Sequence, residues 1–182
     1  MGVFSSKPSS KLVCLGLQNA GKSSILTKIN SHLTGKETSI ESMVPTVGQE
    51  ERVLTFENAK LEVYDMSGAG RYRGTLWVRY LNSVDAIIFV IDSTDELRLA
   101  LVRDELVCLL ENADVRNVPI LFFANKQDLP TALPADQIGA AIGMNEIRDH
   151  DVMIVGSSAM TGDGLMDGFK WVIDRIDPTV KD

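Results

Sequence analysis

The chain has 182 residues, of which 45% are hydrophobic and 24% are charged. This composition is typical of one globular domain, and no apolar run is long enough to predict a membrane span or a secretory leader. The net charge of −7 disfavours broad nucleic-acid binding. Cys14 and Cys108 both lie in apolar stretches, which predicts buried thiols in a reducing, cytoplasmic compartment.

Residues 1–10 are rich in serine and predict a flexible N-terminal segment, followed by one domain over residues 11–182. The segment fits the M-G-x-x-x-[ST] signal for N-myristoylation, with Gly2 as the lipidation site. The alternative is an initiator methionine that happens to precede glycine. A single myristoyl chain binds a membrane only marginally, so we expect reversible membrane attachment at most.

A glycine-rich loop at residues 16–23 fits G-x-x-x-x-G-K-[ST], the phosphate-binding loop. An apolar run typical of a buried strand precedes it, and a helical pattern follows it. Gly16 and Gly21 allow the backbone to curl so that successive N–H groups face a phosphate. Lys22 is placed to reach the β- and γ-phosphates, and the Ser23 hydroxyl is placed to ligate Mg²⁺.

The rest of the chain alternates strand and helix patterns. Residues 30–45 form a long polar connection, and long connections are often functional. Two alternating stretches, 52–56 and 61–65, predict a hairpin with its turn at 57–60. Further buried strands are expected at 85–92, 119–124 and 152–155, and helices at about 76–81, 93–111, 134–142 and 165–176.

This order of elements predicts an α/β fold, namely a mostly parallel six-stranded sheet with one antiparallel edge strand and helices on both faces. Between the hairpin and the helix at 76–81, Gly68, Gly70 and Gly74 predict a flexible stretch. In the helix at 93–111, the apolar face is expected to include Leu97.

Candidate ligands follow several strands, at the edge of the sheet where α/β proteins bind them. Asp65 can hold Mg²⁺ through a water, and the Gly68 N–H can meet a γ-phosphate. On its own this D-x-x-G pattern is equally an ordinary turn.

Asn125, Lys126 and Asp128 form an N-K-x-D pattern directly after the strand at 119–124. A carboxylate can accept two N–H bonds from guanine, a pairing that adenine does not offer, while the amide can donate to N7 and the lysine stem can cover the base. A backbone N–H of Ser158 or Ala159, after the next strand, can reach guanine O6. The alternative is a polar loop without a ligand.

Taken together, these motifs resemble those of small GTPases of the Ras superfamily. The loop at 16–23, the Pro45-Thr46-Val47-Gly48 sequence and the Leu76-Trp77 pair resemble the Arf and Arf-like branch. Three stretches, 65–73, 87–93 and 119–126, are similar to the ciliary Arf-like GTPases associated with the Bardet–Biedl complex, the BBSome. The resemblance extends from about residue 11 to residue 177.

The resemblance implies a monomeric GTP/GDP switch that uses Mg²⁺. Thr46 would be the switch I threonine that ligates Mg²⁺ when GTP is bound, residues 67–81 would be switch II, and the hairpin would be the sliding interswitch. Lys22, Thr46 and Gly68 would serve GTP hydrolysis. The nucleotide-binding residues would be Asn19, Ala20, Gly21, Lys22, Ser23, Ser24, Thr46, Gly68, Asn125, Lys126, Asp128, Ser158 and Ala159.

The implied partners are an exchange factor, a GTPase-activating protein and an effector such as a BBSome-like coat. They would bind switch I, the interswitch and switch II, and none of them is a nucleic acid. The expected location is the cytoplasm, with reversible recruitment through the N-terminal lipid to a membrane near the base of a cilium or flagellum.

The sequence departs from the family pattern at four places. Ala69 replaces the glutamine that orients the attacking water, so we expect slow hydrolysis. Gln49 replaces an aromatic residue, the N-terminal segment is too short for the amphipathic helix of Arf proteins, and Gly74-Thr75 makes switch II one residue longer.

Two questions stay open on sequence alone. Tyr64, Trp77 and Tyr80 are either ordinary core residues or a partner surface, and Arg71 and Arg73 are either solvated charges or partner contacts. The alternative functions are a constitutively GTP-bound scaffold without turnover and a P-loop kinase or ATPase, which the guanine-matching N-K-x-D pattern disfavours.

Overall fold

In the computed structural model, residues 9–40, 43–57 and 59–176 are described. Six strands form one sheet in this part of the chain, in the order β2-β3-β1-β4-β5-β6. All neighbours are parallel except the β2–β3 hairpin, as the sequence predicts. The strands are β1 (Ser10–Leu15), β2 (Gln49–Phe56), β3 (Ala59–Met66), β4 (Ala86–Asp92), β5 (Ile120–Asn125) and β6 (Val152–Gly156).

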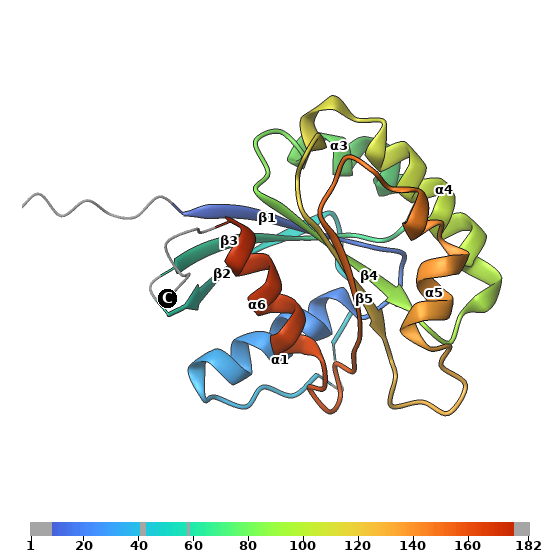
Figure 1. The fold of residues 1–182 in the computed structure, drawn as a ribbon. Helices are drawn as coiled ribbons and strands as arrows, with labels where there is room; N and C mark the ends of the chain where they lie inside the picture. Colours follow the sequence, from blue (N-terminus) through green and yellow to red (C-terminus); the bar gives the residue numbers. More distant parts are fainter. Residues whose placement is uncertain (1–8, 41–42, 58, 177–182) are drawn as a thin grey trace, which may run out of the picture.

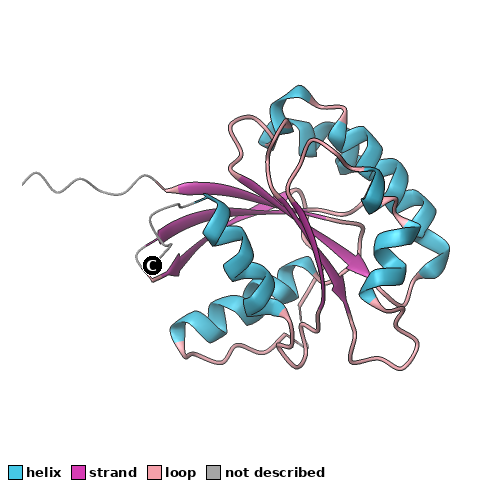
Figure 2. Cartoon of the chain, viewed as in Figure 1, coloured by secondary structure: helices cyan, strands magenta, loops and turns pink. Residues whose placement is uncertain are grey.

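Helices cover both faces of this sheet (Figures 1 and 2). One face carries α1 (Lys22–Thr34) and α6 (Leu165–Ile176), and the other carries α4 (Leu99–Leu110) and α5 (Ala135–Ala141). Because side chains alternate along a strand, Val13 and Leu15 of β1 join the core under α4, whereas Leu12 and Cys14 join the core under α1. The predicted α/β architecture is confirmed.

The segment at residues 67–81, which the resemblance predicts to be switch II and which is called by that name below, is helical from Gly70 rather than flexible up to residue 75. Its helical part consists of α2 (Gly70–Tyr72), the π-helix η1 (Arg73–Trp77) and α3 (Val78–Tyr80). A π-helical turn uses a wider i→i+5 spacing and so accommodates one additional residue. The π segment contains the Gly74-Thr75 pair, at which the sequence predicts an additional residue.

Three predicted burials are wrong. Leu97 is 95% exposed, because the helix begins with the 3₁₀ turn η2 (Glu96–Arg98), which turns this side chain away from the core. Cys108 is exposed on the solvent side of α4, whereas Cys14 is buried, and both are free thiols. The strand β6 is only partly buried, because it lies at the edge of the sheet.

The remaining bounds shift by a few residues. The helix α1 extends to Thr34 and so shortens the predicted loop, and the hairpin strands meet in a tighter turn than 57–60. Short 3₁₀ turns η3 (Ala113–Val115) and η4 (Met144–Glu146) complete the described elements. None of the helices in the described ranges is long and apolar enough to cross a membrane. The predicted lipidation site Gly2 lies outside the described residues.

Candidate functional site

The phosphate-loop motif connects β1 to α1, and two of its glycines are required by the backbone. Gly16 and Gly21 have φ angles of 140° and 96°. A Cβ atom at Gly16 would lie 2.2 Å from the Val90 carbonyl oxygen, and one at Gly21 would lie 2.3 Å from Asn125 Nδ2. The loop therefore packs directly on β4 and β5, which only glycine permits at these positions.

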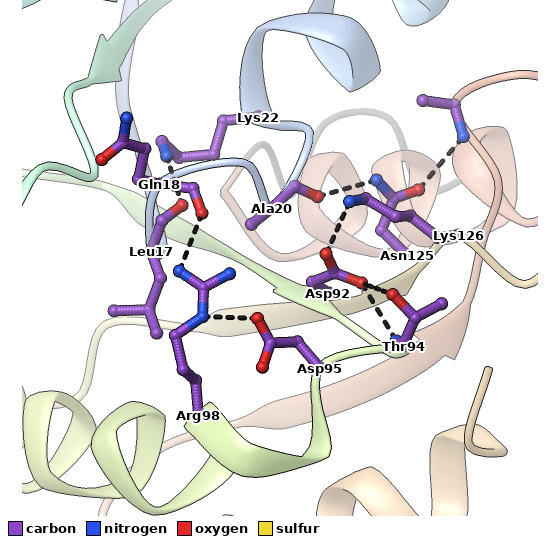
Figure 3. Close-up of polar contacts among 11 residues, drawn as sticks. Leu17, Gln18, Ala20, Lys22, Asp92, Thr94, Asp95, Arg98, Asn125 and Lys126 are labelled. Carbon is purple, nitrogen blue, oxygen red and sulfur yellow. Dashed lines mark hydrogen bonds and ion pairs between the residues drawn. The ribbon is translucent and has the colours of Figure 1, made fainter. Parts of the chain in front are cut away.

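Lys22 lies over the loop that it follows. Its side chain is buried, and Nζ donates hydrogen bonds to the carbonyl oxygens of Leu17 at 2.9 Å (Figure 3) and of Gly16 at 3.0 Å. Burial lowers the pKa of this ammonium group from its usual value. Two carbonyl oxygens of the loop thus hold a buried ammonium group in place, and its positive charge is suited to binding an anion.

The three predicted magnesium ligands come together from three segments. Ser23 Oγ lies 3.0 Å from Thr46 Oγ1 and donates to Asp65 Oδ2 at 2.5 Å. Asp65 is fully buried, and its second oxygen, Oδ1, has no hydrogen-bond partner among the described residues. Two hydroxyls and a carboxylate are hard oxygen donors, so the residues present fit Mg²⁺.

Burial raises the pKa of Asp65, while the Ser23 hydroxyl and the nearby Arg52 and Lys22 charges act in the opposite direction. Keeping this carboxylate charged in the protein interior therefore costs free energy, and a bound cation would lower that cost. The described residues contain no cluster of three His, Cys, Asp or Glu side chains. The oxygen set consequently depends on hydroxyls rather than on a group of acids.

Gly68 begins switch II in direct contact with the phosphate loop. A Cβ atom there would lie 2.4 Å from the Gln18 nitrogen and 2.6 Å from the Gly16 carbonyl oxygen. Together with residues 43–47 and the loop itself, residues 67–69 line a pocket of about 220 Å³ that contains Lys22 and Ser23. Ala69 contributes only a methyl group to this pocket.

Two side chains hold switch II in place. Arg73 Nη1 donates to the Gly68 carbonyl at 3.3 Å, and its Nε forms an ion pair with Glu105 Oε1 of α4 at 2.7 Å. The buried Trp77 donates from Nε1 to the Ser67 carbonyl at 3.1 Å. Arg73 is thus a structural tie between switch II and α4, a role that the sequence does not predict.

The aromatic residues divide between core and surface. Trp77 packs edge-on against Phe89 at a centroid distance of 6.1 Å, inside the core. Tyr64 and Tyr80 are partly buried, and the centroids of their rings lie 5.2 Å apart. Trp77 is therefore a core residue, as one of the two alternatives predicts, while a partner surface formed by Tyr64 and Tyr80 stays a prediction.

Asn125 is buried, and both ends of its amide are occupied. Nδ2 donates to the Ala20 carbonyl at 2.9 Å, and Oδ1 accepts from the Ala159 N–H at 3.1 Å (Figure 3). The sequence predicts contacts of these residues with guanine and does not predict that Asn125 joins the two loops.

Asp128 lies exposed at the surface beside this tie, and its Oδ1 accepts a 2.5 Å hydrogen bond from Ser158 Oγ. The same Ser158 oxygen accepts the N–H groups of Met160 and Thr161. The predicted base-recognition residues from β5 and β6 are thus held next to each other.

Sequence reasoning missed a polar network behind the phosphate loop. Asp92 accepts hydrogen bonds from Lys126 Nζ and from Thr94, and Arg98 pairs with Asp95 while donating to the Gln18 carbonyl at 3.2 Å (Figure 3). Burial alone would raise the pKa of Asp92, but the Lys126 and Thr94 hydrogen bonds lower it. The signal in the sequence is the run of polar residues from Asp92 to Asp95 at the end of β4, of which the sequence analysis predicts only a helix start at residue 93.

A phosphate loop closed by Gly68, a hard-oxygen set and an N-K-x-D motif on a six-stranded α/β sheet define a small GTPase fold with a guanine-nucleotide site. Residues 2–176 match the ADP-ribosylation factor family. The chain belongs to that family, whose members bind guanine nucleotide and hydrolyse GTP.

Individual relatives agree with this assignment. The chain is 39% identical over 167 residues to ADP-ribosylation factor-like protein 6 of Danio rerio, covering 91% of this chain and 87% of the relative. It is also 39% identical over 175 residues to the Caenorhabditis elegans protein of the same name, covering 91% of this chain and 90% of the relative. The chain is thus similar to the ciliary Arf-like group that its sequence resembles.

A solved structure shares the fold closely. The Arl6 BBS3 small GTPase from Trypanosoma brucei, with bound nucleotide analogue GppNp, superimposes with a TM-score of 0.81 at 32% identity. The match covers 92% of this chain and 96% of the trypanosome chain.

Proposed function

We propose that this Arf-like GTPase is a Mg²⁺-dependent switch that recruits effectors to a membrane in its GTP form. The observation that carries the proposal is the meeting of Ser23, Thr46 and Asp65 beside the buried ammonium of Lys22. Thr46 belongs to switch I, so a ligand bound at this point holds a segment that is free to move when the ligand leaves.

In this proposal the phosphates lie against the N–H groups of residues 19–24, with Lys22 on the β- and γ-phosphates. The Ser23 and Thr46 hydroxyls and, through water, Asp65 would hold Mg²⁺. It would neutralise charge on the phosphate oxygens. Gly68 presents its N–H to the γ-phosphate, so that both switches respond to the presence of that group.

The base lies against the loops that follow β5 and β6. Asp128, oriented by the Ser158 hydroxyl, accepts two N–H bonds from guanine, and the Lys126 stem covers one face of the base. Asn125 holds the phosphate loop and the Ala159 backbone in register, which couples the base pocket to the phosphate site.

Hydrolysis is proposed to be slow. Ala69 has no group that can orient a water for attack on the γ-phosphate, and a glutamine in this position supplies that function in related switches. The same observation supports a second candidate function, a GTP-bound scaffold without meaningful turnover.

The proposed output is trafficking at a cilium or of vesicles, in which an effector such as a BBSome-like coat reads the switches. Support comes from similarity to ADP-ribosylation factor-like protein 6 along nine-tenths of the chain. Acylation at Gly2 would supply reversible membrane attachment to a monomeric domain formed by residues 11–182.

Nucleotide competition tests the central proposal. A fluorescent GTP analogue bound to the full chain should be displaced by GTP and GDP but not by ATP, and Lys22→Ala should lose binding. Lys60→Ala, whose side chain is 56% exposed on the hairpin, is the matched control and should bind normally. Preferential displacement by ATP would contradict the guanine assignment.

A further inference from the structure

Arg52 is a charged residue in an apolar position of the hairpin. It lies on the same face of β2 as Leu54 and Phe56, which pack into the core beneath α1. Only 19% of its side chain is exposed. The hairpin therefore carries a positively charged side chain on the face that packs toward α1.

Hydrogen bonds hold this guanidinium in one place. Nη1 donates to Thr27 Oγ1 of α1 at 2.8 Å, and Nη2 donates to Glu50 Oε2 at 3.2 Å. Thr27 is itself buried, so the α1 contact is shielded from water. The charge is therefore fixed between α1 and the start of β2.

The third neighbour of Arg52 is the buried carboxylate of the metal-ligand set. Nη2 lies 3.8 Å from Asp65 Oδ2, the oxygen that accepts the Ser23 hydroxyl. Asp65 is fully buried and Oδ1 has no hydrogen-bond partner among the described residues. Arg52 thus places a positive charge next to this buried carboxylate, where a bound metal ion would also place one.

We propose that Arg52 is a competing counter-cation of Asp65, which stabilises the metal-free site and weakens Mg²⁺ binding. The inference rests on the magnesium site of the proposed function. A divalent ion placed beside the Ser23, Thr46 and Asp65 oxygens experiences repulsion from the fixed guanidinium, and a partly buried site screens that repulsion little. Arg52 acts through Asp65 and is a positioning residue, not a catalytic one.

A purely structural role for Arg52 predicts the opposite result. If the guanidinium only braced Asp65, its loss would loosen the oxygen set and weaken Mg²⁺ binding. If it competes with the metal, its loss strengthens Mg²⁺ binding. A metal ion held by these oxygens beside bound nucleotide would stabilise the nucleotide complex, so tighter metal binding should also slow nucleotide release at a limiting Mg²⁺ concentration.

The experiment follows release of a fluorescent GDP analogue from the full chain over a series of buffered free Mg²⁺ concentrations. Arg52→Gln keeps a donor for Thr27 but removes the charge. It should lower the midpoint, the free Mg²⁺ concentration at which the slowing of release is half-maximal, by roughly tenfold. Arg52→Met, a second neutral variant, should shift it in the same direction. Arg103→Gln removes one positive charge from a surface pair with Glu146 on the α4 side and should leave the midpoint unchanged.

The outcomes separate the inference from the proposed function. An unchanged or higher midpoint in whichever neutral Arg52 variant folds overturns the role of Arg52. An equal shift in Arg103→Gln also overturns it, because net charge alone would then explain the effect. If release of the GDP analogue from the wild-type chain does not depend on Mg²⁺, the result contradicts the proposed magnesium site, and the inference about Arg52 falls with that site.

Discussion

The side chain of Asn125 donates from Nδ2 to the carbonyl oxygen of Ala20 at 2.9 Å, although the two residues are 105 positions apart. Its Oδ1 accepts the Ala159 N–H, so one amide at the end of β5 joins the loops that follow β1 and β6. The geometry of the phosphate loop is therefore set partly by a residue of the base-recognition motif.

Truncation of this amide should cost stability as well as nucleotide affinity. Asn125→Ala leaves a buried carbonyl and a buried N–H without partners, which costs about 1–3 kcal/mol for each group. We expect urea unfolding of the nucleotide-free chain to shift to lower concentration. As a control, Asn82→Ala at an exposed position should unfold as the wild type does. Equal unfolding midpoints for Asn125→Ala and the wild type would contradict the structural tie.

The Asp128 carboxylate should decide which base is bound. In Asp128→Asn one acceptor oxygen becomes a donor, so the pairing with the guanine N1 and N2 hydrogens is lost, whereas xanthine offers a carbonyl in place of the amino group. We expect GTP affinity to fall on the order of 100-fold and XTP affinity to rise.

Competition binding with GTP and XTP measures this exchange of preference. The surface variant Asp163→Asn, on the neighbouring loop, serves as the comparison. Undiminished GTP affinity in Asp128→Asn would rule out the proposed base contact.

The ion pair between Asp92 and Lys126 should make stability depend on pH. Burial works against the charged carboxylate, but the hydrogen bonds from Lys126 and Thr94 prevail and lower its pKa. A lowered pKa in the folded state means that the pair stabilises the protein above the unfolded carboxyl pKa, about 3.9, and that this stabilisation is lost as pH falls through the folded value.

Asp92→Asn removes this dependence, so the variant should be less stable than the wild type at pH 7, by at most about 1 kcal/mol. The difference should narrow in strongly acidic buffer. Chemical unfolding at the two pH values measures it, and a constant difference would exclude Asp92 as its source.

Two glycines of switch II should respond in opposite ways to alanine. Nothing lies within 4 Å of a Cβ atom at Gly74, which is exposed within the π-helix. Gly74→Ala should therefore stabilise the helix by about 0.5–1 kcal/mol. A Cβ atom at Gly68 would lie 2.4 Å from the Gln18 nitrogen, so Gly68→Ala should push switch II away from the loop and lower the melting temperature. Thermal unfolding of both variants checks this contrast.

The sequence predicts most of the sheet and the composition of the site, because strands, glycine loops and the N-K-x-D motif depend on short-range patterns. It fails where the local geometry of a helix start or a long-range contact decides how a side chain is placed. Leu97 has an apolar side chain in a helical pattern, but a 3₁₀ start rotates it into solvent. Arg52 alternates with apolar residues on β2, and only the packed fold brings it to Asp65 and Thr27.

Ala69 provides the direct test of turnover. Ala69→Gln restores an amide that can orient a water beside the pocket formed by the phosphate loop and residues 67–69. Single-turnover hydrolysis of bound GTP should accelerate by at least roughly tenfold, because positioning of the attacking water is a main contribution of the protein to this reaction. The affinity for GDP should not change, since residue 69 lies at the γ-phosphate end of the proposed site.

The matched control is Ala69→Leu, which adds a side chain of similar length without a hydrogen-bonding group and should stay as slow as the wild type. Acceleration by both substitutions would point to a change in the position of switch II rather than to water orientation. Equal rates for the wild type and Ala69→Gln would show that Ala69 does not limit hydrolysis. If neither hydrolyses GTP, the result favours the GTP-bound scaffold over a slow switch.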